Sequence, residues 1–240
     1  MLQSTKPKEN MKRAFTLIEL VFVVVIAGIL AFVLIPKSSD TKLLQATNQI
    51  ISHIRYTQHL AINGDQFDPN DKNWYKKMWR ISFSNINNKK DDKYNGWNYV
   101  VWRDSQGGST ANPNSPKEIA PDPAAPGKLL YANVSGGHRW VSDSTRNPKL
   151  NLTNTYNIKD IKFANFKKKN SKTLIFDELG RVYSPKIDNP YDNKHDQIAT
   201  ITLTHKNGQS LSIMIEQETG YVCIAKKEKD LITCDENYNL

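Results

Sequence analysis

The feature that most constrains this chain is an apolar run of 21 residues, FTLIELVFVVVIAGILAFVLI, at residues 15–35, interrupted by a single charge at Glu19. A helix of that length spans about 30 Å, the thickness of a bilayer core. The flank before it is basic, and basic flanks stay on the cytoplasmic side. We therefore expect one membrane-spanning helix at 15–36, with residues 37–240 beyond the membrane. The basic flank consists of Lys6, Lys8, Lys12 and Arg13 against Glu9.

A cleaved secretory signal is the alternative, because it also combines a basic start with an apolar stretch. Two features oppose it. No small-x-small site followed by a break comes after the run, and Pro36-Lys37 leads into another helical pattern. A carboxylate such as Glu19 costs about 3 kcal/mol at mid-membrane, less near the end of the span, and a signal peptide has no use for it. The sequence favours an anchor that is retained.

The segment KRAFTLIELVFVVVIAGILA closely resembles the type IV prepilin family, including the pseudopilins of type II secretion, over residues 12 to about 36. The resemblance implies a leader at residues 1–14, cleaved between Ala14 and Phe15 by a prepilin peptidase on the cytoplasmic face. Methylation of the new Phe15 amine would follow. Ala14 stands where Gly is usual, which predicts slower processing. Met1 and Met11 both remain open as the true start.

The resemblance also assigns roles to Glu19 and Pro36. Glu19 becomes the fifth residue of the processed chain and directs assembly, and Pro36 corresponds to a frequent helix-kinking proline of the family. A buried carboxylate needs a cation, and the N-terminal amine of a neighbouring subunit supplies one. The alternative is a glutamate that snorkels from a helix end.

Beyond the apolar run, residues 41–62 repeat apolar side chains at spacings of three and four, which predicts an amphipathic helix that ends at Asn63-Gly64. Strand patterns follow, and Asn207-Gly208 between two of them predicts a hairpin. A helix followed by an antiparallel sheet packed on its apolar stripe is an α+β fold, here pilin-like. The expected strands lie at 78–84, 96–102, 128–134, 158–163, 172–177, 181–184, 197–204, 209–216 and 221–225.

Three further segments resemble more narrowly the H-type minor pseudopilins and the related FimT-like minor pilins. They are ISHIRYTQHLAI late in the helix, FDELGRVY at 176–183, and IMIEQETGYV, which ends at Val222. Residues 104–127, in contrast, hold five of the eleven prolines and show no periodicity, so we expect a long surface loop there. This loop either contacts partners or is a flexible insertion without a role of its own.

Cys223 and Cys234 are the chain's two cysteines. Outside the cytoplasm we expect them to be oxidised, and a bridge across ten intervening residues contributes on the order of 3 kcal/mol. This spacing also resembles the C-terminal disulfide loop of many pilins. Two free buried thiols are the alternative. No histidine or second cysteine pair has zinc-site spacing.

Lys226, Lys227 and Lys229 lie between the cysteines on an expected loop. The formal net charge is +9, or +6 after loss of a leader carrying +3, which is compatible with phosphate contacts to DNA. Solvated lysines are the simpler interpretation. Several minor pilins of competence systems bind DNA, so the resemblance leaves a competence minor pilin as the alternative function.

No catalytic, cofactor-binding or metal-binding pattern is present. The sequence lacks G-x-S-x-G, Walker, dinucleotide and H-E-x-x-H motifs, and its acidic clusters lack the EF-hand order. We expect a non-enzymatic structural subunit of a filament, without cofactor or metal. The implied partners are other pilins or pseudopilins, an inner-membrane assembly platform and the prepilin peptidase. Secretion, pilus and DNA-uptake machines all remain open, as do major and minor roles. The acidic clusters are Asp65, Asp68 and Asp71, and Asp188, Asp192 and Asp196.

Overall fold

The computed structural model describes residues 16–34, 38–64, 67–87, 94–105, 112–133, 141–185, 188–228 and 231–238. The chain divides into two compact units, Met1–Ser38 and Ser39–Leu240. In the first unit, helix α1 (Leu17–Leu34) occupies most of the predicted apolar span. Among the described residues, no helix has the combined length and hydropathy required to cross a membrane.

Helix α2 (Ser38–Asn63) is the spine of the second unit. The predicted stripe is buried, including Leu43, Ile50 and Ile54. The helix ends at the predicted place, where the Gly64 N–H donates to the Leu60 carbonyl at 3.0 Å. Residues 35–37 lie outside the described part of the chain, so α1 and α2 are treated as two separate helices.

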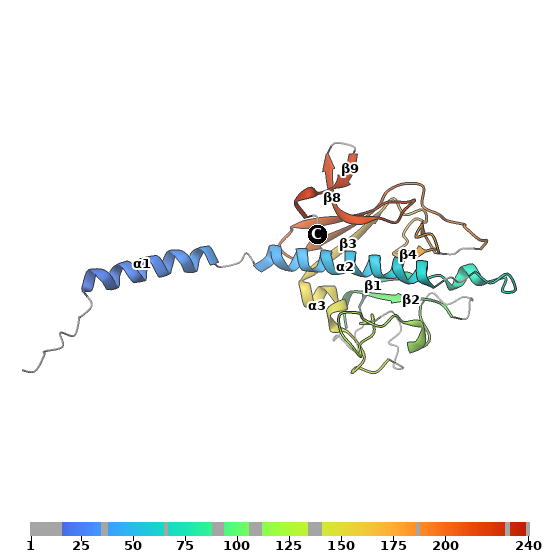
Figure 1. Cartoon of the computed structure of the whole chain (residues 1–240), viewed down its shortest axis with the longest axis horizontal. Helices are drawn as coiled ribbons and strands as arrows, with labels where there is room; N and C mark the ends of the chain where they lie inside the picture. The colour runs from blue at the N-terminus through green and yellow to red at the C-terminus, as the bar shows by residue number, and fades with distance from the viewer. Residues whose placement is uncertain are drawn as a thin grey trace, which may run out of the picture. The chain divides into compact units, whose positions relative to one another are not determined.

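Two antiparallel sheets accompany α2 (Figure 1). The first has the order β2-β1-β4-β5 and the second the order β3-β6-β7-β8-β9. The strands of the first sheet are β1 (Arg80–Ile86), β2 (Gly96–Trp102), β4 (Thr173–Phe176) and β5 (Val182–Tyr183). Those of the second are β3 (Ile158–Ala164), β6 (Ala199–His205), β7 (Ser210–Ile215), β8 (Val222–Glu228) and β9 (Leu231–Cys234).

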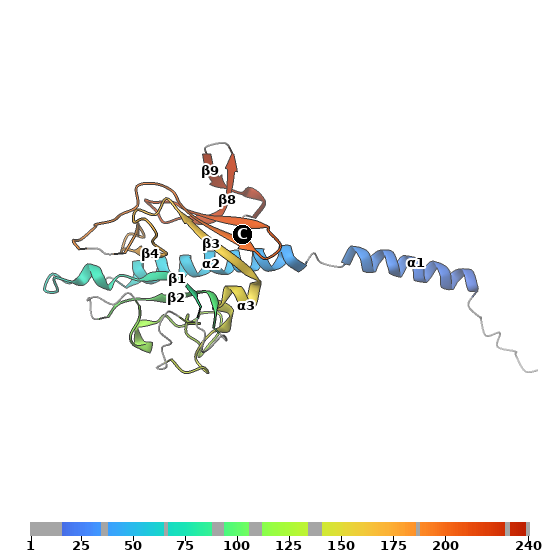
Figure 2. The same cartoon turned by 180° about the vertical axis from the view of Figure 1, so that it is seen from behind.

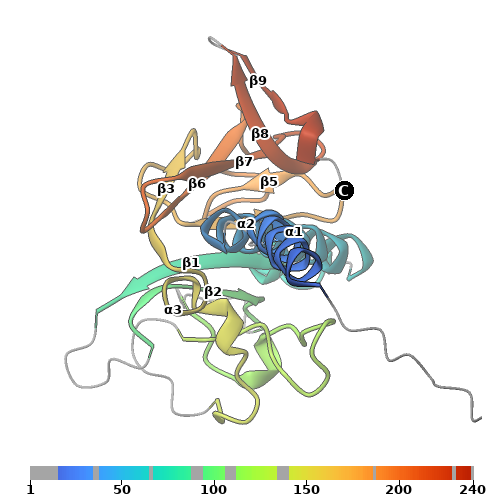
Figure 3. The ribbon, with the colours of Figure 1, turned by 90° about the vertical axis from the view of Figure 1, so that its left-hand side faces the viewer.

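Helix α2 runs between β1 and β2 on one side and β3, β6, β7 and β8 on the other (Figures 2 and 3). One continuous apolar core joins its stripe to side chains of both sheets, such as Ile81 of β1 and Ile213 of β7. Short helical segments complete the unit: α3 (Leu152–Tyr156) and the 3-10 helices Trp74–Lys77, Pro116–Glu118, Pro148–Leu150 and Glu236–Tyr238.

The α+β class is confirmed, but the sheet is split in two. The reason is that β4 pairs with β1, with Ile81 opposite Leu174, while β3 pairs with β6. The β3–β4 connection therefore passes from one sheet to the other. The predicted hairpin forms, because β6 and β7 pair around a turn in which Gly208 has a φ of +90°.

Two sequence-based expectations about irregular segments were wrong. The described part of 128–134 is not a strand; it makes only isolated bridges, one of them between Leu129 and Pro121, and a proline cannot donate to a ladder. The segment expected as a surface loop, 104–127, includes a buried stretch at Glu118–Ala120. The carboxylate of Glu118 accepts from the Ser105 N–H and hydroxyl and from the Asn114 N–H, which satisfies the buried charge.

Candidate functional site

The first turn of α1 holds the one charged side chain of that helix, Glu19. Thr16 precedes the helix, and its N–H and hydroxyl both donate to Glu19 Oε2 at 3.4 Å. In return, the Glu19 N–H donates to Thr16 Oγ1 at 3.3 Å. This reciprocal pair is a capping box, which satisfies backbone donors that a helix start leaves unpaired. The carboxylate also lies at the positive end of the helix dipole.

Over residues 17–30, the surface of α1 apart from Glu19 is apolar on every side. The large apolar side chains in this range are exposed, at 49–82%. A helix that is apolar all round requires lipid or other apolar helices as its surroundings. The large exposed side chains are Leu17, Ile18, Leu20, Val21, Phe22, Val23, Val24, Val25, Ile26, Ile29 and Leu30. Four predicted site residues lie outside the described residues: Ala14, Phe15, Pro36 and Lys229.

A disulfide joins Cys223 of β8 to Cys234 of β9, with Cα atoms 5.7 Å apart. The two strands form an antiparallel hairpin in which Ala225 lies opposite Cys234. In Figures 1 and 3, this hairpin projects from the rest of its sheet. The bridge therefore fixes the base of a protruding element.

Two of the lysines proposed for DNA contact, Lys226 and Lys227, lie on a strand and not on a loop, because β8 continues to Glu228. The sequence pattern missed this extension, since a charged strand without alternation carries no period-two signal. Lys226 Nζ lies 2.6 Å from Glu228 Oε1, with side chains 51% and 65% exposed. This ion pair joins two exposed side chains of the same strand, and DNA contact by these lysines stays a prediction.

The three segments that resemble H-type minor pseudopilins meet at one place, which we call the three-motif junction (Gln58, Gly180, Thr219 and Gly220). Gln58 Nε2, from α2, donates to the Gly180 carbonyl at 3.1 Å and to the Thr219 carbonyl at 2.5 Å. Gly180 and Gly220 have positive φ angles of +79° and +65°. A Cβ on Gly220 would overlap the Gly180 carbonyl oxygen. Each of the three segments thus contributes to a tight contact between α2 and two turns.

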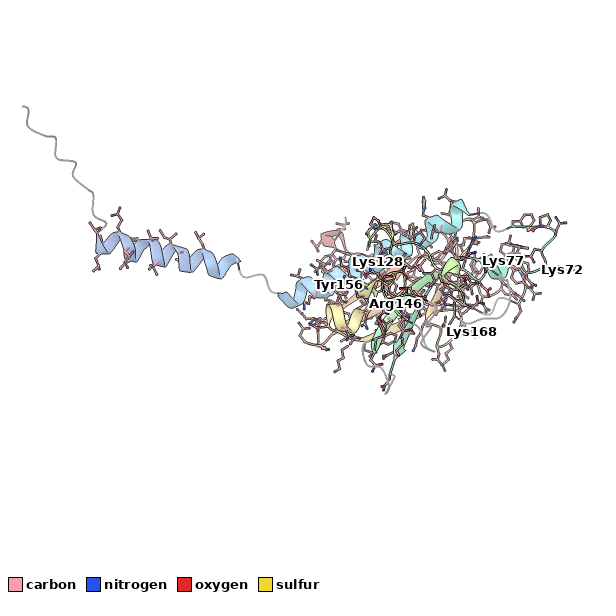
Figure 4. The ribbon with its side chains drawn as sticks, turned by 90° about the horizontal axis from the view of Figure 1, so that it is seen from below. Lys72, Lys77, Lys128, Arg146, Tyr156 and Lys168 are labelled. Atoms are coloured by element: carbon pink, nitrogen blue, oxygen red, sulfur yellow. A yellow bond between two sulfur atoms is a disulfide. The ribbon has the colours of Figure 1, made fainter. Side chains whose placement is uncertain are left out.

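A second polar cluster, which the sequence did not reveal, ties α2 to β2 and α3. Gln49 Nε2 donates to Tyr99 Oη at 2.7 Å, and the Tyr156 hydroxyl donates to Gln49 Oε1 at 2.6 Å. Tyr99 Oη is 2.7 Å from His53 Nδ1. Burial raises the pKa of Tyr99 and lowers the pKa of His53, so a neutral imidazole accepts from a protonated hydroxyl. Figure 4 labels Tyr156, the member of this cluster on α3.

Both polar clusters join segments that are distant along the sequence. Within the described ranges, no group of three or more His, Cys, Asp and Glu side chains could hold a metal ion. The partners of Gln49 and Gln58 are 50 to 161 residues away along the sequence. Such separations leave no local pattern in the sequence, so neither cluster could be predicted from it.

Comparison with known proteins gives a match over one region of the chain, near its N-terminus. A family model of the prokaryotic N-terminal methylation motif matches residues 10–35, the signature of type IV prepilin-like proteins. The match covers residues 10–14 of the expected leader and the whole apolar run at 15–35, including Glu19. Neither curated proteins nor solved structures give a match to the chain.

Proposed function

We propose that this chain, which carries the prokaryotic N-terminal methylation motif at residues 10–35, is a structural subunit of a type II secretion or type IV pilus-like filament. In this role, a prepilin peptidase cleaves between Ala14 and Phe15 and the new amine of Phe15 is methylated. The motif is typical of structural subunits and of no enzyme family.

The observation that carries the proposal is the combination of this motif with the surface of α1. The helix presents apolar side chains on every side and one carboxylate in its first turn. In the membrane, lipid covers that surface before assembly; in a filament, the α1 helices of neighbouring subunits cover it. Glu19 then pairs with the terminal amine of a neighbour, which neutralises two charges in one step.

The proposed location follows from the same features. The chain is held by residues 15–36 in the bacterial inner membrane, with residues 37–240 in the periplasm, where an oxidising environment maintains the bridge between Cys223 and Cys234. Its partners are other pilins or pseudopilins, the assembly platform and the peptidase. The three-motif junction supports an H-type, FimT-like minor subunit, because the three resembling segments contact one another in the fold.

The test is co-assembly in cells that contain the filament machinery, with and without the peptidase. Sheared filaments are sedimented and probed for the chain. We expect a processed chain in the filament fraction only when the peptidase is present. A chain that is absent from the filaments, or that enters them unprocessed, would contradict the proposal.

A further inference from the structure

Two segments that each hold part of an acidic cluster meet at one end of the second unit. The first, residues 67–77, follows α2, and the second, residues 188–193, follows β5. The Tyr75 hydroxyl of the first donates to the Asp188 carbonyl of the second at 2.6 Å, so the two segments lie side by side. Figure 4 labels Lys72 of the first segment at this end of the unit. Neither the filament role nor the methylation motif uses this surface.

Three rings of these segments form one array, which we call the aromatic platform (Phe67, Trp74 and Tyr191). The ring centroid of the buried Trp74 lies 5.3 Å from that of Phe67 and 6.3 Å from that of Tyr191, both in edge-to-face geometry. Phe67 is 58% exposed and Tyr191 is 48% exposed. Two exposed rings that share one buried ring as their support present a rigid aromatic surface to solvent.

The surroundings hold Tyr191 in a strained conformation. Its φ is +69°, a left-handed value that a bulky residue rarely adopts. Arg181 Cζ lies 5.2 Å from the centroid of the Tyr191 ring, and the buried Asp177 carboxylate fixes Arg181 Nε at 2.7 Å. Maintained strain of this kind is concentrated at ligand-binding positions. The ring is also preorganised, which lowers the entropy cost of binding a ligand.

Polar groups that accept hydrogen bonds border both exposed rings. Asp68 follows Phe67 directly, and Asp192 follows Tyr191 directly. Asp68 Oδ1 accepts from the Asn70 N–H at 2.9 Å, and this contact uses one of the two oxygens through which a carboxylate accepts. The two segments together contain three lysines and four aspartates, so neither sign of charge dominates. This balance favours an uncharged ligand over a polyanion or a polycation.

We infer that the aromatic platform binds a neutral saccharide chain, with pyranose rings against Phe67 and Tyr191 and hydroxyl groups on Asp68 and Asp192. A pyranose has a face of C–H bonds, which packs on the negative face of an aromatic ring, and a rim of hydroxyls, which donate to carboxylates. A protein partner would use such rings as anchors at the desolvated centre of an apolar patch. Here a carboxylate adjoins each ring, so the saccharide fits better. This binding goes beyond the filament role.

The experiment is titration calorimetry of the full-length chain with two neutral hexasaccharides, in a detergent without a sugar headgroup. Cellohexaose offers hydroxyls alone and chitohexaose adds acetamido groups, so the pair shows which sugar is preferred. A hexasaccharide of galacturonic acid is the acidic counterpart.

Three variants are compared with the wild type. Tyr191→Asn removes the ring at a φ that asparagine tolerates, and Phe67→Leu removes the ring but keeps apolar bulk. Tyr238→Asn is the matched control, because Tyr238 is an exposed tyrosine on the 3-10 helix Glu236–Tyr238, outside the platform. Circular dichroism melting confirms that each variant is folded.

We expect at least one neutral hexasaccharide to bind, with an affinity that changes by less than about twofold between low and high salt. Tyr191→Asn and Phe67→Leu should each weaken this binding about fivefold or more, because each loses one stacked ring. Tyr238→Asn should leave the affinity within about twofold of the wild type, as expected for a ring that makes no contact with the ligand. The acidic hexasaccharide should bind more weakly than the neutral one.

Three results would overturn the inference. The first is that neither neutral hexasaccharide binds, which would leave the exposed rings as a contact surface for a protein. The second is an equal loss of affinity in Tyr238→Asn and in the two platform variants. The third is tighter binding of the acidic hexasaccharide. Because binding is measured on the isolated chain, failure here leaves filament assembly untouched, and failure of assembly leaves this result standing.

Discussion

Thr16 and Glu19 cap each other: the Thr16 N–H and hydroxyl reach the Glu19 carboxylate at 3.4 Å, and the Glu19 N–H reaches Thr16 Oγ1 at 3.3 Å. The carboxylate therefore has two separable properties in this chain. It caps its own helix, and in the proposed filament its charge pairs with a neighbour's amine. A substitution that keeps one property and removes the other distinguishes them.

Replacement of Glu19 by Gln keeps the cap, because a glutamine at this position also reaches back to the helix start. It removes the charge. We expect E19Q to be processed normally and to fold normally, with filament incorporation reduced at least tenfold, as measured by sedimentation of sheared filaments. E19A serves as the control that removes both cap and charge. Normal incorporation of E19Q would show that the charge is not required.

From the geometry of the three-motif junction, we predict how alanine substitutions at two glycines change the stability of the fold. Gly208 and Gly220 both have positive φ, which costs alanine roughly 1–2 kcal/mol at either position. A Cβ at Gly208 meets nothing within 4 Å, whereas at Gly220 it overlaps the Gly180 carbonyl oxygen and lies 2.6 Å from Gln58 Nε2. We expect G220A to lower the free energy of unfolding by about 1–3 kcal/mol more than G208A, measured by urea denaturation. Equal effects would mean that the junction is not tightly packed.

The fold was predictable wherever local pattern and local pairing coincide. The stripe of α2 and the β6–β7 hairpin are examples, because spacing and the Asn207-Gly208 turn specify them within a few residues. The division into two sheets was not predictable, because it depends on the pairing of β1 with β4, which lies about 90 residues further along the chain. The buried carboxylate of Glu118 was also not predictable, because its partner Ser105 is 13 residues away within the same proline-rich segment, which has no periodic pattern.

For the site, the sequence identified Glu19 and the cysteine pair through a resemblance, but not their surroundings. The ion pair between Lys226 and Glu228 follows from the extension of β8, which a charged sequence without alternation conceals. The contact of Gln58 with Gly180 and Thr219 joins segments that are 122 and 161 residues away. Only tertiary structure brings such residues together.

The disulfide makes a prediction about stability. Reduction of the bridge between Cys223 and Cys234, or the double variant C223S/C234S, should lower the free energy of unfolding by about 3 kcal/mol, because the unfolded chain gains freedom. Urea denaturation with and without dithiothreitol measures this effect. The double variant should not respond to the reductant. A wild-type chain whose free energy of unfolding is equally insensitive to dithiothreitol would contradict the presence of the bridge.

His195 makes a prediction about pH. Burial lowers its pKa to about 4; the Asp196 carboxylate opposes this effect and Lys167 reinforces it. In the unfolded chain, a histidine titrates near 6.5. As the pH falls from about 6.5 to 4, the unfolded state therefore gains a proton that the folded state does not, and stability decreases by up to about 3 kcal/mol. Above that range, this group contributes no pH dependence.

Denaturation curves between pH 4 and 8 test this sign. We expect His195→Gln to flatten the loss of stability below about pH 6.5, and His59→Gln, on the exposed surface of α2, serves as the matched substitution for comparison. The buried ring of His53 has a lowered pKa as well and adds to the same trend. An unchanged acid profile in His195→Gln would contradict the assignment.

The central claim is that the chain is processed within the methylation motif at residues 10–35 and then assembled. The most direct measurement is the intact mass and N-terminal peptide mass of the chain recovered from the filament fraction. The account predicts a chain that begins at Phe15 and carries one methyl group on its amine. A chain in that fraction that still begins at Met1 or Met11 would contradict it.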